Sequence, residues 1–201
     1  EIIKGIGKLL AVDFLNELKQ RLFRGLEWFR LAHTESDQVT VLSKIVMMAT
    51  AFEIMLKFPI RGKRKYFIDF VEENISTDSF LRETRTNHKG KTIEMNVASC
   101  WAWDFYNLRS KIVHGESIPY EDLIFKDWIT HLIVSDLVFL ECIKIELFKN
   151  KFIGDNVYSC ANKIFKGTDE KERENVIKAL ANWHLGFDDV HKALGWVQDK
   201  D

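Results

Sequence analysis

The chain has 201 residues, of which 46% are hydrophobic and 12% aromatic, so it is long enough to bury a single core. Its 29 Lys and Arg residues against 30 Asp and Glu residues give a net charge of −1. This balance excludes a globally basic nucleic-acid binder and an acidic solvating tail. Only two prolines and ten glycines interrupt the chain, which favours helices over an all-β or a disordered chain.

The first third of the sequence predicts three helices. Apolar residues recur every three or four positions over residues 6–32, which predicts the first helix. Residues 38–58 are apolar nearly all round and stop at Pro59, so we expect a second, central helix there. The third helix, over residues 61–75, opens with a cluster of basic residues.

A polar stretch follows over residues 76–96, and we expect a long loop with a helical turn around residues 80–81. The sequence Asn-His-Lys-Gly at residues 87–90 is a turn signal. Long loops in compact domains usually carry function, so this segment is a candidate for binding.

Two long helices are predicted next. The first spans residues 97–114 and is closed by Gly115 as the residue just past its C-terminus. The second spans residues 121–150. Charged residues interrupt its most apolar part, residues 131–148, so it is a buried helix rather than a membrane span.

The fold class is therefore predicted to be all-α. We expect an up-down bundle of long antiparallel helices over residues 1–152, and over residues 153–201 a small C-terminal pair of short helices packed on it. The three cysteines form no CxxC pair, and no Cys and His residues are spaced as zinc ligands. Reduced cysteines and the absence of a visible signal peptide predict a cytoplasmic protein. Because the chain begins with Glu rather than Met, we expect it to be a piece of a longer protein.

The most informative segment is the end of the helix over residues 97–114, which reads Leu-Arg-Ser-Lys-Ile-Val-His-Gly over residues 108–115. At about 100° per residue, one side of this helix carries a compact apolar stripe that predicts its core face. Arg109 and His114 flank a second face, roughly opposite, that also carries Tyr106 and Trp103. An apolar second face edged by cationic side chains suggests a partner surface, most simply a dimer interface.

This segment resembles the HEPN superfamily, and most closely its Apea-like branch, in which an Arg-x4-His motif ends a long helix. The segment Ala-Phe-Glu-Ile-Met-Leu over residues 51–56 is similar to the other recurrent helix of the family. The resemblance covers roughly residues 36–150.

The resemblance implies a metal-independent endoribonuclease that acts as a toxin or anti-phage (abortive-infection) effector, with a composite active site at a homodimer interface. It implies that His114 is the general acid and base and that Arg109 holds the scissile phosphate; both side chains suit these roles. Ser110, Tyr106 and Glu53 are the supporting residues, and Glu53 is the buried carboxylate that we expect beside Arg109. No cofactor and no metal are implied.

The expected partners are RNA, a second copy of the chain, and an antitoxin, another defence-system protein or a sensor domain outside this sequence; no membrane is expected. Two local groups of positive charge on the otherwise neutral protein predict RNA contacts. Those candidate RNA-binding residues are Arg61, Lys63, Arg64, Lys65, Arg82, Arg85, Lys89 and Lys91.

Several alternatives remain open at this point. An Arg and a His near a helix C-terminus are favourable there simply because cations complement the helix dipole. The basic residues also fit solvated surface positions. Ser110 stands where active HEPN members often have Asn, Asp or His, which favours a catalytically inactive HEPN module that binds RNA, nucleotide or a protein partner. A weaker alternative takes residues 185–190 as a protein-docking hairpin.

Overall fold

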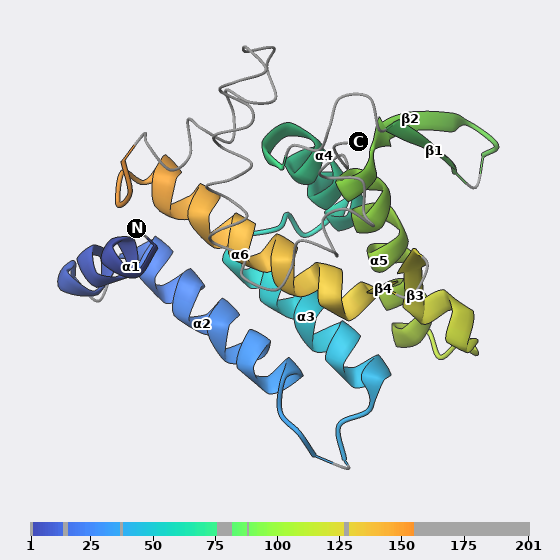
Figure 1. Ribbon diagram of the computed structural model, residues 1–201, viewed down its shortest axis with the longest axis horizontal. Helices are drawn as coiled ribbons and strands as arrows, with labels where there is room; N and C mark the ends of the chain where they lie inside the picture. Colours follow the sequence, from blue (N-terminus) through green and yellow to red (C-terminus); the bar gives the residue numbers. More distant parts are fainter. Residues whose placement is uncertain are drawn as a thin grey trace, which may run out of the picture.

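The computed structural model describes residues 2–13, 16–36, 38–75, 82–87, 89–126 and 129–154, and within them it is mostly helical (Figure 1). The elements are α1 (Ile2–Ala11), α2 (Glu17–Ala32), α3 (Val41–Met55), α4 (Lys63–Asn74), β1 (Arg82–Thr86), β2 (Thr92–Asn96), α5 (Val97–Val113), the short 3₁₀ helix η1 (Tyr120–Leu123), β3 (Ile124–Lys126), β4 (Ile129–Thr130) and α6 (His131–Lys149). The predicted helical appendage over residues 153–201 lies almost entirely outside the described residues.

The helices pack around one aromatic core. α2 and α3 lie side by side, α6 packs against α3 and α5, and α4 packs along α5 (Figure 1). Phe52 of α3 lies at the centre of this core, with its ring centroid 4.8 Å from that of Phe67 and 6.2 Å from that of Trp101. All three side chains are at most 1% exposed. The prediction that the helix around residues 41–55 is central is thus confirmed.

Side-chain caps determine where several helices begin. The side chains of Asn16, Thr40 and Asn96 each accept a hydrogen bond from the backbone N–H three residues later, at the start of α2, α3 and α5. The Asn16 cap explains why the single helix predicted over residues 6–32 was wrong, since the chain leaves α1 at Ala11 and starts α2 afresh.

Two further predictions of the all-α description need correction. The segment predicted as a long loop forms the antiparallel hairpin of β1 and β2, with Thr84 opposite Glu94. Its turn lies at the predicted residues: the Asn87 side chain accepts hydrogen bonds from the backbone N–H groups of Lys89 and Lys91, at 2.9 and 3.0 Å. The predicted helical turn at residues 80–81 lies outside the described residues.

The helix predicted over residues 121–150 begins later than expected. Residues 120–130 instead form η1 and the short antiparallel pair of β3 and β4, in which Ile124 lies opposite Thr130. Thr130 then caps α6, which starts at His131. In the described part of the chain, no helix has the length and apolarity needed to cross a membrane.

Candidate functional site

The C-terminal end of α5 positions the two residues of the Arg-x4-His motif. His114 is the C-cap residue, and Gly115 follows it with a positive φ of 73°. The backbone N–H of Gly115 donates to the Ile112 carbonyl, and that of Glu116 donates to the Lys111 carbonyl. These two bonds form a Schellman motif, which needs the left-handed conformation that glycine adopts without strain. The predicted C′ glycine is therefore confirmed, and His114 is exposed where the helix ends.

Arg109 points toward a buried carboxylate on another helix. Its Nη2 lies 3.4 Å from Oε1 of Glu53 on α3, and the Glu53 side chain is only 13% exposed. The same carboxylate accepts a hydrogen bond of 2.6 Å from the Tyr106 hydroxyl and one of 2.5 Å from Lys63 of α4. The predicted proximity of Glu53 to the motif arginine is confirmed.

The Tyr106 hydroxyl remains protonated in this arrangement. Burial raises the pKa of its phenol well above the ordinary value, and the hydrogen bond to Glu53 raises it further. The Tyr106 ring also lies under the Arg109 guanidinium, whose central carbon is 5.7 Å from the ring centroid. Tyr106 thus fixes both the carboxylate and the arginine from the helix that carries the motif.

The second face of α5 differs from the sequence-based expectation. Tyr106 and Trp103 are 6% and 8% exposed, because α4 covers them within the same chain. Arg64 of α4 lies over the Trp103 ring at 4.8 Å and donates to the Asn107 side chain at 2.6 Å. The apolar part of this face is therefore not a free partner surface, and only its end, with Val113 at 51% exposure and His114, reaches solvent.

The basic residues at the start of α4 lie close to the end of α5. Lys63 binds Glu53 and Arg64 binds Asn107, whereas Lys65 pairs with Asp69 along its own helix, at 2.5 Å. Arg61 is exposed just before α4. These residues provide local positive charge beside the motif, and three of the four are already engaged in contacts within the protein.

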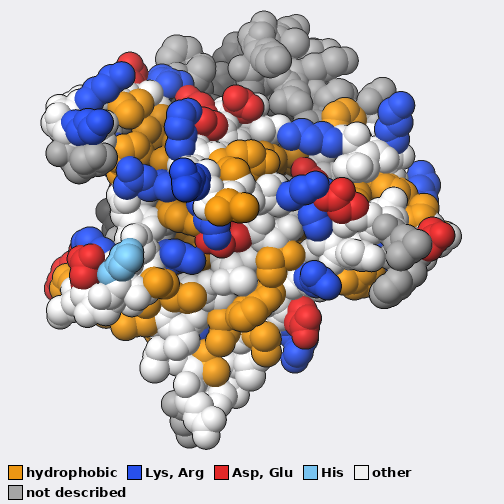
Figure 2. Space-filling model, turned by 180° about the vertical axis from the view of Figure 1, so that it is seen from behind, with side chains coloured by type: hydrophobic (Ala, Val, Ile, Leu, Met, Phe, Trp, Pro, Cys, Tyr) orange, Lys and Arg blue, Asp and Glu red, His pale blue; other side chains and the backbone are white. Residues whose placement is uncertain are grey.

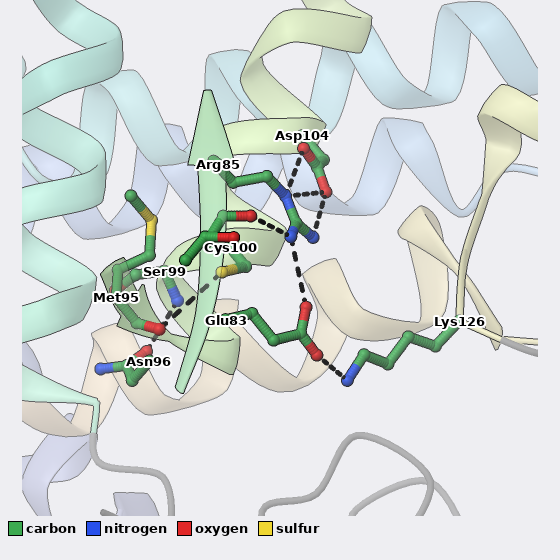
Figure 3. A network of polar contacts seen from close by, with 9 residues as sticks. Glu83, Arg85, Met95, Asn96, Ser99, Cys100, Asp104 and Lys126 are labelled. Carbon is green, nitrogen blue, oxygen red and sulfur yellow. Dashed lines mark hydrogen bonds and ion pairs between the residues drawn. The ribbon is translucent and has the colours of Figure 1, made fainter. Parts of the chain in front are cut away.

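The basic residues of the hairpin divide into two kinds. Arg82 pairs with Glu72 at 3.1 Å. Arg85 donates to both carboxylate oxygens of Asp104 on α5: its Nε lies 3.1 Å from Oδ1 and its Nη2 lies 2.8 Å from Oδ2 (Figure 3). Lys89 and Lys91 at the hairpin turn are exposed. On the face shown in Figure 2, Lys and Arg side chains occur in small groups among apolar and acidic ones rather than in a continuous basic stripe.

Arg85 belongs to a network that attaches the hairpin to the rest of the fold. In Figure 3 it lies between Asp104 and Glu83, and Glu83 in turn contacts Lys126 of β3. Burial raises the pKa of the Asp104 carboxyl by more than the adjacent guanidinium lowers it. Arg85 therefore serves first to join β1, α5 and β3.

The structure also shows a cavity that the sequence did not reveal. It measures about 510 Å³ and lies between α5, η1, β3 and the start of α6. Its wall includes Asn107 and Ser110, two turns and one turn of α5 before His114, and His131 from α6. The one sequence signal for this cavity is His131, which directly follows the capping Thr130. The sequence-based prediction placed this histidine in the interior of a longer helix.

Among the described residues, no group of three or more His, Cys, Asp or Glu side chains is arranged to hold a metal ion. Likewise, no hydrogen bond or ion pair joins Arg109 to His114 in that part of the chain. No protein-family model matches the sequence, and neither a curated protein nor a solved structure matches the chain. The resemblance to the HEPN superfamily therefore depends on the motif and its surroundings alone.

Proposed function

We propose that this protein is a metal-independent endoribonuclease of HEPN type, acting as a toxin or anti-phage effector, with a composite active site at a homodimer interface. The observation that carries the proposal is the placement of the motif. His114 is exposed at the glycine-closed end of α5, and one turn earlier Arg109 is oriented by a buried carboxylate. A catalytic pair needs this combination of an accessible proton carrier and a fixed phosphate ligand.

The proposed reaction uses the RNA itself as the nucleophile. A histidine accepts the proton of a ribose 2′-hydroxyl while its oxygen attacks the adjacent phosphorus. The bond to the 5′-oxygen then breaks, and a protonated histidine returns a proton to that oxygen. The products are a 2′,3′-cyclic phosphate and a 5′-hydroxyl end, and the Arg109 guanidinium stabilises the charge that develops on the phosphate oxygens.

A specific observation also favours a second candidate, a catalytically inactive HEPN module that binds RNA, nucleotide or a protein partner. Arg109 already pairs with Glu53, and Ser110 beside it is a weaker polar group than the one usual in active members. In such a module the motif helps to hold α5 against α3, and the basic residues around α4 provide the binding surface.

Cleavage of total RNA and of tRNA in the presence of EDTA separates the two candidates. The wild type is compared with Arg109→Ala and His114→Ala, and light scattering reports the oligomeric state. His33→Ala is a matched control, because His33 is also an exposed C-cap histidine, on α2. We expect a loss of about 100-fold or more in each motif variant, the size usual for an acid–base or charge-stabilising group, and little change in the control.

The products carry a second test. Fragments that end in a cyclic phosphate and a 5′-hydroxyl are expected, and 3′-hydroxyl ends would indicate a different nucleophile. A folded, dimeric wild type that leaves RNA intact, free of any inhibitor, would contradict the ribonuclease. RNA binding that persists in that protein, and weakens when Arg61 and Lys65 are replaced by Ala, would support the binding module instead.

A further inference from the structure

The 510 Å³ cavity beside α5 is of the size that proteins use for small-molecule ligands. Apart from Glu116, its lining residues come from α5, η1, β3 and the start of α6. Leu108 and Ile124 provide its apolar wall, and most of its remaining lining is polar. Two features indicate what it accepts: the sign of its charge and one buried histidine.

The lining is negatively charged. Four carboxylates border the cavity, and the one cation among the lining residues, Lys111, already binds Asp122 at 2.8 Å. A second carboxylate, that of Asp104, is held by Arg85 from the hairpin side. The side-chain carboxylates of Glu116 and Glu121 make no hydrogen bond or ion pair with any described residue, so two carboxylates remain for a ligand.

His131 supplies an independent observation. Its side chain lines the cavity, the residue is only 4% exposed, and its Nδ1 is buried without a hydrogen-bond partner. Burial lowers the pKa of the ring to about 4, so the imidazole is neutral at physiological pH and offers one nitrogen as an acceptor. Because Nδ1 itself has no exposed surface, a ligand N–H reaches this neutral ring at the edge that lines the cavity.

From these features we infer that the cavity is a binding site for an organic cation with an amine or guanidinium head. Such a head donates several hydrogen bonds to Glu116, Glu121 and the neutral His131, and its alkyl chain packs on the apolar wall. A phosphate is disfavoured by the surplus of carboxylates. A bare metal ion is disfavoured because no three ligating side chains converge among the described residues.

This inference does not depend on the ribonuclease proposal, because neither Arg109 nor His114 lines the cavity. The same head group occurs in two sources, a free polyamine and an arginine side chain of a partner protein. Their shared chemistry is the proposal, and two probes distinguish the sources: spermidine, and an acetylated and amidated Gly-Arg-Gly peptide.

Isothermal titration calorimetry of the whole chain with each probe tests the site. We expect one-to-one binding of at least one probe, weakened about tenfold or more in Glu116→Gln/Glu121→Gln, because each replacement removes a charge-assisted hydrogen bond. Glu27→Gln, which removes one negative charge from an exposed position on α2, is the control and should change the affinity less than twofold. Binding of spermidine alone indicates a free polyamine, and binding of the peptide alone indicates an arginine of a partner.

NMR of the histidine rings gives a readout that does not require a variant to fold. Saturation with the bound probe should shift the ring signals of His131 and leave those of His33, at the far end of α2, unchanged. The inference is overturned if neither probe binds at millimolar concentration, if the double variant binds as the wild type does, or if the His131 ring does not respond.

Discussion

Acidification should destabilise this protein through His131, the buried histidine at the start of α6. Its pKa lies at about 4 in the folded protein, against an ordinary value of 6.5, chiefly because burial disfavours the charged ring. Arg85 lowers the pKa further, and Asp122 opposes the shift. Between pH 4 and pH 6.5 the His131 ring is therefore protonated in the unfolded chain but not in the folded chain, so the stability falls as the pH falls.

The size of the effect follows from the two pKa values. Each pH unit within that window costs about 1.4 kcal/mol, so the loss reaches about 2 kcal/mol between pH 7.5 and pH 5. It approaches about 3 kcal/mol near pH 4 and then levels off, because both states are protonated below that pH. Against a typical total stability of about 5–15 kcal/mol, a change of this size is measurable.

Urea denaturation followed by circular dichroism at several pH values measures the loss. The comparison with His131→Gln isolates it, because carboxylates such as Asp136 titrate in both proteins and cancel in the difference. We expect the stability gap between wild type and variant to shrink by about 2 kcal/mol from pH 7.5 to pH 5. A gap that stays constant, or that shrinks equally in the exposed control His33→Gln, would refute the argument.

Two further predictions concern the ends of α5 and its link to the hairpin. Gly115→Ala should lower the free energy of unfolding by about 1 kcal/mol, because alanine is strained at a φ of 73°. Gly7→Ala, at an exposed helical position where an added Cβ meets nothing within 4 Å, should raise that free energy by about 0.5 kcal/mol. Urea denaturation measures both changes, and changes of the same sign would contradict the reasoning. A double-mutant cycle of Arg85→Ala and Asp104→Ala should give a coupling of about 1 kcal/mol for the two-pronged ion pair, and additive single effects would show that the pair does not attach the hairpin.

The sequence predicted those parts of the fold that depend on local periodicity. α5 was predicted almost to the residue, because an apolar stripe, a clear start after a polar turn and a closing glycine all lie within twenty residues of one another. The hairpin of β1 and β2 was missed because both its faces are largely polar. What holds it is the pair of Arg85 and Asp104, nineteen residues apart, which no local pattern reveals.

The start of α6 was missed for a related reason. Residues 121–130 are compatible with a helix by composition, and the pairing of Ile124 with Thr130 competes with that choice only after the chain has folded back on itself. The misplaced helix start also concealed His131. A histidine in the middle of a buried helix is interpreted as a core residue. The same histidine at a helix start, where it lines a cavity, is a candidate for ligand binding.

For the candidate site, the helical geometry of α5 predicted on which side of the helix each side chain lies, but not which residues of other helices it contacts. It correctly separated Arg109 from the core stripe. The partner of Arg109 was expected on other grounds, because an acid inside an apolar helix usually has a partner, and Glu53 does contact Arg109. It did not show that α4 lies over Tyr106 and Trp103, because the packing of a separate helix is not encoded in the spacing of α5. The apolar second face was therefore interpreted as a dimer interface when it is covered within the chain.

The contacts of Glu53 bear on which candidate function is favoured. If Arg109 were its only cation, the pair would be a closed ion pair and the arginine would be poorly available to a phosphate. Instead Lys63 lies nearer, at 2.5 Å against 3.4 Å, so one carboxylate is shared by two cations. Local positive charge therefore remains beside the motif, and the Arg109 side chain is 25% exposed, although its Nε is itself buried. A partly exposed guanidinium with a fixed orientation and a second cation beside it suits phosphate binding, and this favours the ribonuclease over the inactive module.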